Sequence, residues 1–258
     1  MVAADLHIHT TNSDGTLDLD GVLERARAAD LMAVAVTDHD RLHPALQSPI
    51  TEMNGLVVVH GIELRVEAGQ QRLDLLGYGV RRTAPLTDEL ERLQADRIER
   101  GRAMVTAVEN CIGIDLELDI GPGFGRPDVA RAVAAKTDYN VQGVFDELIG
   151  EGCPAYVARN VPEFARGAAL LQEACKFVSL AHPLRANEPS AALERAGSLD
   201  AVELYYPYDE APDLDLVHQA IDEYDLLVTG GSDAHDGSSV GTVGLDASEW
   251  SQVQASLT

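Results

Sequence analysis

The amino-terminal stretch DLHIHTTNSDGT carries two histidines, His7 and His9, that are two positions apart. In an extended strand such residues point to the same face, so both imidazoles could bind one ion. Asp14 follows in a turn-like Asn-Ser-Asp-Gly sequence and adds a carboxylate. Imidazole and carboxylate are ligands that proteins use for zinc, manganese and iron. The stretch therefore predicts part of a metal site.

Other apolar runs of the chain also end in, or contain, histidine, aspartate or glutamate. Counted along the chain, nine residues are predicted metal ligands: His7, His9, Asp14, His39, Glu63, Asp74, His182, Asp233 and His235. One ion takes about three or four protein ligands, so this set suffices for two or three ions, with Glu63 as the natural bridging carboxylate. The other histidines, His43, His60 and His218, are not predicted ligands, and His60 is expected in the core.

Seven short apolar runs are predicted to form buried parallel strands. They cover residues 3–9, 32–39, 56–64, 72–79, 177–183, 199–206 and 226–235. Helical patterns occupy 18–30, 162–175 and 212–224. Strands that alternate with helices imply βαβ units, and in a parallel barrel the carboxyl ends of all strands open onto one face. The sequence therefore predicts an α/β barrel that brings the nine ligands to one mouth.

The middle of the chain does not follow this pattern. Residues 86–110 are predicted to form one long charged helix, and shorter helices are expected near 127–137 and 141–150. No convincing strand run occurs between about 82 and 154. The predicted organisation is a barrel domain of residues 1–83 plus 155–258, with a helical insertion of residues 84–154.

The chain is strongly acidic, with 43 Asp plus Glu against 19 Lys plus Arg, a net charge of −24. We interpret this as an adaptation to a salty cytoplasm, hence a halophilic host. An acidic surface argues against stable binding of duplex nucleic acid, because a polyanion needs arginine or metal ions to reverse the local charge. The sequence contains no membrane span and no signal segment, and its three cysteines are widely spaced. These features predict a cytoplasmic protein, and the oligomeric state stays open.

The motifs resemble those of the polymerase and histidinol phosphatase (PHP) family. The matching stretches are DLHIHTTNSDG, AVTDHD, GIEL, LAHP and GSDAH, in this order and nearly end to end. The resemblance implies a distorted seven-stranded (β/α) TIM-like barrel with a trinuclear metal site held by the nine ligands. Within that set, Asp14, His39 and Glu63 are expected to be catalytic.

A more specific resemblance is to the PHP phosphoesterases that act on nucleoside 3′,5′-bisphosphates and on the 5′ ends of short RNA. It rests on the long helix followed by GRPDVARAV, GCPAYV and LAHPLR. It implies that the insertion caps the barrel mouth, that Arg185 contacts phosphate, and that Asp128 lies on the substrate side. Arg126, in the insertion, is a second candidate for a contact with phosphate. Asp74 stands where many members have histidine, which implies an altered metal preference. Asp128 also stands where the branch commonly has histidine, so the substrate contact there departs from the pattern.

The predicted reaction is hydrolysis of a phosphate ester of a small nucleotide or short RNA. A metal-bound hydroxide would attack phosphorus at a site of two or three Mn²⁺, Fe²⁺ or Zn²⁺ ions. Arg185 would add a bidentate contact to phosphate as a catalytic and substrate-binding residue. Tyr205, Tyr206 and Tyr208 follow a strand and could stack on a base or pack at the rim. The alternatives are a histidinol-phosphatase-like phosphomonoesterase, an amidohydrolase-like enzyme that cleaves C–N bonds, and a non-catalytic metal-binding module.

Overall fold

The computed structural model describes residues 1–121, 123–209 and 212–258. The chain divides into two compact units, one of residues 1–87 with 161–258 and one of residues 88–160. We call the first the barrel unit and the second the helical unit. The expectation that the helical segment caps the barrel mouth stays a prediction.

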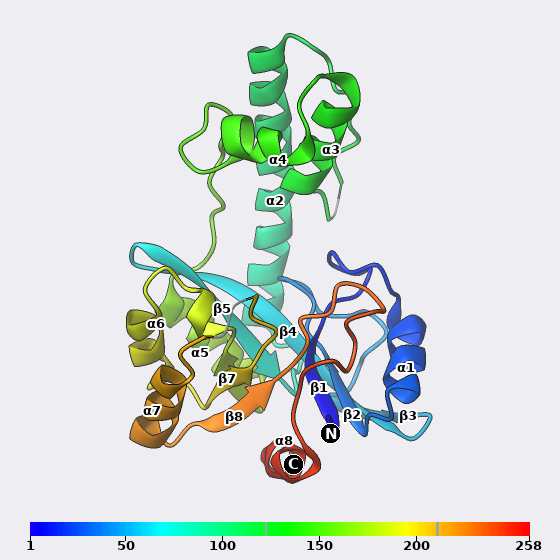
Figure 1. The fold of residues 1–258 in the computed structure, drawn as a ribbon, viewed down its shortest axis with the longest axis vertical. Helices are drawn as coiled ribbons and strands as arrows, with labels where there is room; N and C mark the ends of the chain where they lie inside the picture. The colour runs from blue at the N-terminus through cyan, green and yellow to red at the C-terminus, as the bar shows by residue number, and fades with distance from the viewer. Residues whose placement is uncertain (122, 210–211) are drawn as a thin grey trace. The chain divides into compact units, whose positions relative to one another are not determined.

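The barrel unit is built on seven strands that form a nearly closed sheet (Figure 1). In order around the sheet they are β1 (Ala4–Ile8), β2 (Ala33–Val36), β4 (Leu56–Ala68), β5 (Gln71–Tyr78), β6 (Phe177–Leu180), β7 (Ala201–Tyr205) and β8 (Leu227–Gly230). The additional strand β3 (Ile50–Met53) pairs with β4 and was not predicted. The segment after β8 returns to β1, where the amide of His9 donates to the carbonyl of Ala234 at 2.9 Å. The predicted α/β barrel class is confirmed.

The expectation that all strands run parallel is wrong at β5. This strand pairs antiparallel with both β4 and β6, whereas β1–β2, β2–β4, β6–β7 and β7–β8 are parallel. The reason is the connection: residues 69 and 70 alone join β4 to β5, and so short a turn can only reverse the chain. Gly69 has a φ of +79°, which glycine adopts without steric cost. The resulting register places Arg65 of β4 opposite Asp74 of β5.

Helices of the barrel unit lie outside the sheet. They are α1 (Leu19–Ala28), α5 (Phe164–Ala174), α6 (Pro189–Ala196), α7 (Asp215–Tyr224) and α8 (Ala247–Leu257), and the 3₁₀ turn η2 spans Pro183–Arg185. The predicted helices correspond to α1, α5 and α7, while α6 and α8 were not predicted. Asp246 begins α8 by accepting the amides of Ser248 and Glu249, so this helix has a proper N-cap.

The packing of β1 decides where its two histidines point. Ile8 is buried in the cluster formed with α1, together with Val22 and Leu23. Neighbouring residues of a strand face opposite sides, so His7 and His9 point away from α1. They face the inside of the barrel, where the site lies.

The helical unit holds most of α2 (Ala84–Ile112), with α3 (Arg126–Lys136), α4 (Val141–Val144) and the π-turn η1 (Phe145–Ile149). Its core is formed by apolar side chains that include Met104, Val108, Val133, Val144 and Ile149. These helices match those expected from the sequence, and between residues 82 and 154 the described part of the chain forms no strand.

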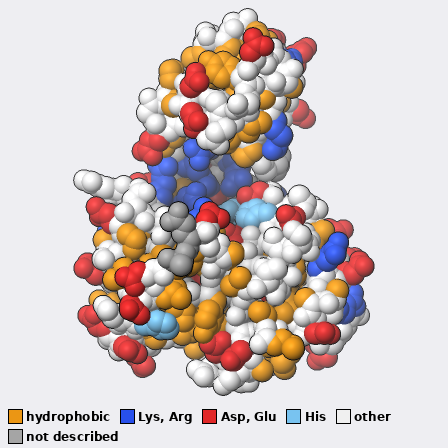
Figure 2. Space-filling view, in the orientation of Figure 1, with side chains coloured by type: hydrophobic (Ala, Val, Ile, Leu, Met, Phe, Trp, Pro, Cys, Tyr) orange, Lys and Arg blue, Asp and Glu red, His pale blue; other side chains and the backbone are white. Residues whose placement is uncertain are grey.

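The acidic side chains are dispersed over the visible face of each unit rather than gathered in one block (Figure 2). This distribution agrees with a charge excess that is spread along the sequence. Among the described helices, none combines the length and apolar character that a membrane span needs.

Candidate metal centre

The centre of the site is a buried carboxylate between two buried imidazoles. Glu63 Oε1 lies 3.6 Å from His7 Nε2, and Glu63 Oε2 lies 3.4 Å from His9 Nε2. All three side chains are at most 1% exposed. The two oxygens of Glu63 therefore face different imidazoles, so each oxygen could bind a different ion, as in a bridging carboxylate.

Eight of the nine predicted ligands fall into three groups, and within each group the ligand atoms lie within 4.8 Å of one another. The first group is His9, Asp14, His39 and His235, the second is His7, His9 and Glu63, and the third is Glu63, Asp74 and His182. His9 and Glu63 are shared, so the groups form one connected cluster. The cluster runs from a buried end to an open one, because the His9 side chain is 0% exposed and that of Asp14 is 48% exposed.

Asp233 joins the same cluster from the segment after β8. Its Oδ1 lies 3.1 Å from His9 Nε2 and 3.4 Å from His7 Nε2. The backbone of Asp233 has a φ of +49° and that of His182 a φ of +27°, both in the left-handed region that non-glycine residues avoid. Such backbone strain is typical of functional sites, where the surrounding structure holds a side chain in place. The structure thus brings all nine predicted ligands together, and their binding of metal stays a proposal.

The innermost polar atoms of the cluster lack well-formed hydrogen bonds, although charged groups lie close to them, such as His39 Nδ1 at 2.6 Å from Glu63 Oε2. Within the described residues, His7 Nε2, both ring nitrogens of His9 and Glu63 Oε2 are buried and lack a partner in hydrogen-bond geometry. An unsatisfied buried polar group costs about 1–3 kcal/mol. Coordination of a divalent cation would satisfy these atoms, and the nitrogen and carboxylate donors suit Zn²⁺, Mn²⁺ or Fe²⁺. The residues present therefore fit the metal ions that the sequence predicts.

The protonation of the cluster is set by its mixture of charges. Burial lowers the pKa of His39, but Glu63 and Asp14 outweigh it and raise this pKa to about 9. Burial raises the pKa of Glu63, but His39 and His7 hold it well below its usual range. In the absence of metal, the carboxylates are thus ionised and face imidazoles with raised pKa values, except that burial lowers the pKa of the central His9. A divalent cation would replace the protons on those imidazoles.

A buried glutamate outside the predicted set orients two of the ligands. Glu203, on β7, is 0% exposed, and its Oε1 lies 3.0 Å from Nδ1 of His7. Its Oε2 accepts the backbone amide of His182 at 2.8 Å. The first contact fixes the tautomer of His7 so that Nε2 faces Glu63. The sequence held a signal for this residue, since a glutamate inside the apolar run AVELYY requires a buried partner.

Asp38 holds the loop that carries Asp14. It is 1% exposed and accepts the amide and hydroxyl of Thr10, the side-chain amide of Asn12 and the hydroxyl of Ser13. The four donor groups come from three residues of the turn after β1, so one carboxylate organises much of this turn. Asp38 therefore acts on the position of Asp14 rather than on an ion.

Arg185 reaches the cluster at Asp233. Its guanidinium donates to Tyr206 Oη at 2.6 Å and lies 3.7 Å from Asp233 Oδ2. Tyr206 in turn donates to Asp233 Oδ2 at 2.8 Å. Tyr206 thus links the arginine to a predicted ligand, whereas Tyr205 donates to Glu249 outside the cluster. The predicted contact of Arg185 with phosphate stays a proposal.

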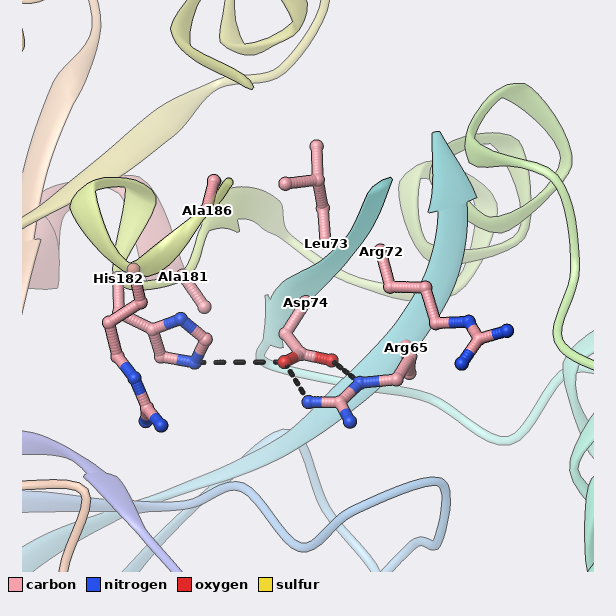
Figure 3. Close-up of a pocket in the computed structure, with 8 residues that line it drawn as sticks. Arg65, Arg72, Leu73, Asp74, Ala181, His182 and Ala186 are labelled. Carbon is pink, nitrogen blue, oxygen red and sulfur yellow. Dashed lines mark hydrogen bonds and ion pairs between the residues drawn. The ribbon is translucent and has the colours of Figure 1, made fainter. Parts of the chain in front are cut away.

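The side of the cluster next to Asp74 contains an arginine that the sequence reasoning missed. Arg65 donates to both oxygens of Asp74, with Nε–Oδ1 at 2.7 Å and Nη2–Oδ2 at 2.5 Å. His182 lies on the other side of the carboxylate, with Nε2 3.8 Å from Oδ2 (Figure 3). A cavity of about 140 Å³ opens beside them, and Arg72 and Arg185 also line it.

Arg126 and Asp128 lie in the helical unit, at the start of α3. Asp128 accepts the amide of Gly125 at 2.8 Å and pairs with Arg131 at 2.7 Å, so it caps the helix. Arg126 lies over the ring of Phe145, 5.8 Å from its centroid. Their predicted contact with substrate stays a prediction.

The histidines that were not predicted as ligands lie apart from the three groups. His60 is 1% exposed in β4, as expected of a core residue, and His43 is 8% exposed. Burial lowers the pKa of His60 to about 4. His218 is exposed on α7.

The chain is similar to known proteins in sequence and in fold. The PHP domain model matches residues 5–150. The chain is 25% identical over 250 residues to a 3′,5′-nucleoside bisphosphate phosphatase of Chromobacterium violaceum, covering 91% of this chain and 88% of that protein. It is 26% identical over 191 residues to a 5′-3′ exoribonuclease of Haemophilus influenzae, covering 71% and 69%. A solved structure described as an amidohydrolase from Chromobacterium violaceum, with sulfate and no metal, superposes with a TM-score of 0.76 at 23% identity over 98% of this chain and 96% of that chain, which shows a shared fold.

Proposed function

The chain belongs to the PHP domain family, and we propose that it is a metal-dependent phosphoesterase that hydrolyses phosphate esters of nucleotides. The observation that carries this proposal is the cluster of nine imidazole and carboxylate side chains with unpaired atoms at its buried centre. Two groups of the cluster would each hold a divalent ion. His7, His9 and Glu63, with Asp233 beside them, form one site, and Asp14, His39 and His235 form the other.

The residues of the chain divide the work of phosphate ester hydrolysis. Bound metal ions would clamp phosphate oxygens and lower the pKa of water. Arg185 is placed to bind a phosphate oxygen, and Tyr206 holds its guanidinium in position by accepting from it. Glu203 keeps Nε2 of His7 turned toward the centre. Phosphoryl transfer depends mainly on such positioning and on neutralisation of charge.

For the substrate we propose a nucleoside 3′,5′-bisphosphate or the 5′ end of a short RNA. The support is similarity to a bisphosphate phosphatase and to an exoribonuclease, each over more than two thirds of the chain. Arg126 and Asp128, which the sequence analysis predicts as substrate contacts, are part of this proposal.

The test is release of inorganic phosphate or nucleotide by the purified protein with Mn²⁺ in high salt. The substrates are adenosine 3′,5′-bisphosphate, a 5′-phosphorylated RNA oligomer and histidinol phosphate. We expect turnover of one of the first two, and a loss of at least about 100-fold in His9→Ala. Removal of even an outer partner of a metal ligand costs 10- to 100-fold.

His218→Ala is the matched control, because this histidine is exposed on α7. It should leave the rate unchanged. Turnover of histidinol phosphate alone would reject the nucleotide substrate. Activity that survives removal of metal by a chelator would reject the metal-dependent mechanism.

A further inference from the structure

The third group of the cluster differs from the other two in its electrostatic surroundings. Its carboxylate, Asp74, is 4% exposed and already accepts two hydrogen bonds from Arg65. The paired atoms form the parallel fork that guanidinium and carboxylate prefer. Among the carboxylates of the cluster that the structure describes, Asp74 is the one that accepts two hydrogen bonds from an arginine, whereas Arg185 makes a longer contact of 3.7 Å with Asp233.

The fold holds Arg65 firmly in this position. Arg65 and Asp74 are directly opposite each other in the β4–β5 hairpin, so their pairing is set by the strand register. The backbone amide of Arg65 also donates to Asp40 at 3.3 Å. Arginine does not lose its proton in proteins, so the positive charge at this place is permanent.

The remaining two ligands of the third group have partners of their own. His182 Nε2 lies 3.1 Å from Glu63 Oε1, and His182 is held by the contact of its amide with Glu203. A cation placed among Glu63, Asp74 and His182 would share the Asp74 carboxylate with the guanidinium, and the two positive charges would repel each other. The group therefore has the right atoms for an ion and a fixed charge that opposes one.

We propose that the guanidinium of Arg65 takes the place of a third metal ion, and that the site binds two divalent ions. In this arrangement Asp74 binds the guanidinium of Arg65 and is not a metal ligand. The resemblance to PHP proteins implied a trinuclear site with Asp74 as a ligand, so the proposal departs from the expectation drawn from sequence. It rests on the metal binding of the proposed function.

The position of Arg65 also suits its charge to the binding of phosphate. It lines the same cavity as Arg72 and Arg185, beside His182 (Figure 3). A phosphate group that enters this cavity would contact arginine side chains. These would lie where a third metal ion would otherwise contact the phosphate. Arg65 would then bind phosphate as a residue of the chain, independent of metal supply.

The experiment counts metal ions. Metal-free protein is dialysed to equilibrium against saturating free Mn²⁺, and manganese per chain is measured by elemental analysis. We expect two ions for the wild type. In Arg65→Gln the guanidinium is removed and Asp74 stays, so the count should rise to three.

Arg72→Gln is the matched control, because Arg72 lines the same cavity but pairs with Glu67. Its count should stay at two. Circular dichroism checks that each variant is folded, and the double variant Arg65→Gln with Asp74→His replaces the single variant if the unpaired aspartate prevents folding. The double variant is also expected to bind three ions.

A count of three in the wild type would overturn the proposal, since Arg65 would then coexist with a third ion. A count of two in both the wild type and the folded Arg65 variants would also overturn it. A wild type that binds fewer than two ions would reject the metal centre itself, and with it this inference. A wild type that binds two ions but turns over none of the proposed nucleotide substrates would leave the inference standing and reject the proposed reaction instead.

Discussion

At the scale of single residues, the site depends on carboxylates that bind no ion. Glu203 contacts the ring of His7 with one oxygen and the backbone of His182 with the other, and it is completely buried. Removing its charge would weaken the basicity of His7 and free its ring to rotate. The residue is therefore a positioning residue with two targets.

Glu203→Gln should lower the affinity for Mn²⁺ by about 10- to 100-fold, the usual cost of losing an outer partner of a metal ligand. The amide keeps the volume and one acceptor, so the fold should persist. Isothermal titration of metal-free protein with Mn²⁺ measures the affinity. Glu24→Gln, an exposed change on α1, is the control and should bind like the wild type. Equal affinities for all three proteins would contradict the positioning role.

At the scale of elements, side chains after β2 hold the loop after β1: Asp38 accepts hydrogen bonds from it, and Arg41 donates to the carbonyl of Asn12. Asp38 accepts hydrogen bonds from four donor groups of Thr10, Asn12 and Ser13. The hydroxyl of Thr10 donates to both carboxylate oxygens, and the side-chain amide of Asn12 donates to Oδ2. The two loops carry Asp14 and His39, so the geometry of the open group depends on this junction. Strand pairing alone would not place these side chains.

Asp38→Asn should lower the free energy of unfolding by about 1–3 kcal/mol, because an amide group would face the donors of Thr10 and Asn12. Urea denaturation of the metal-free protein measures this loss. The control is Asp18→Asn, since Asp18 caps α1 by accepting from Gly21 and asparagine caps a helix equally well. If both variants lose the same stability, the junction has no special role.

At the scale of the whole molecule, the cluster links stability to pH. The pKa of His39 is about 9 in the folded metal-free protein against an ordinary value of 6.5, and the pKa values of His7, His182 and His235 are also raised, because the facing carboxylates outweigh burial. The folded state thus binds more protons than the unfolded state between these values. Such a group stabilises the fold fully below pH 6.5 and loses that contribution as the pH rises toward about 9.

We therefore expect the free energy of unfolding of the metal-free protein to fall between pH 6.5 and about 9, by an amount on the order of 3 kcal/mol. With Mn²⁺ bound the fall should disappear, because the metal has displaced the protons. Urea denaturation at several pH values, with and without Mn²⁺, measures both curves. A metal-free curve that rises over this range would contradict the protonated cluster.

Much of the site can be predicted because its residue types are unusual in apolar runs. Histidine and carboxylate at the ends of strands, such as His39 and His182, are visible in the sequence itself, and the parallel strands carry them to one side of the sheet. The seven strands and the long helix of the insertion follow from the spacing of apolar residues in the same way. Strand β3 and helix α8 were missed because neither has a strong apolar pattern of its own.

What only the tertiary structure decided are the partners of these side chains. Sequence determined the donor set, because the identity of a ligand depends on its own chemistry. It did not determine that β5 runs antiparallel, and that reversal is what places Arg65 against Asp74. Nor did it show that Glu203, in a distant strand, reaches His7. Contacts between residues far apart in the chain depend on strand register and direction, and these are set by the packing of the whole barrel rather than by any local pattern.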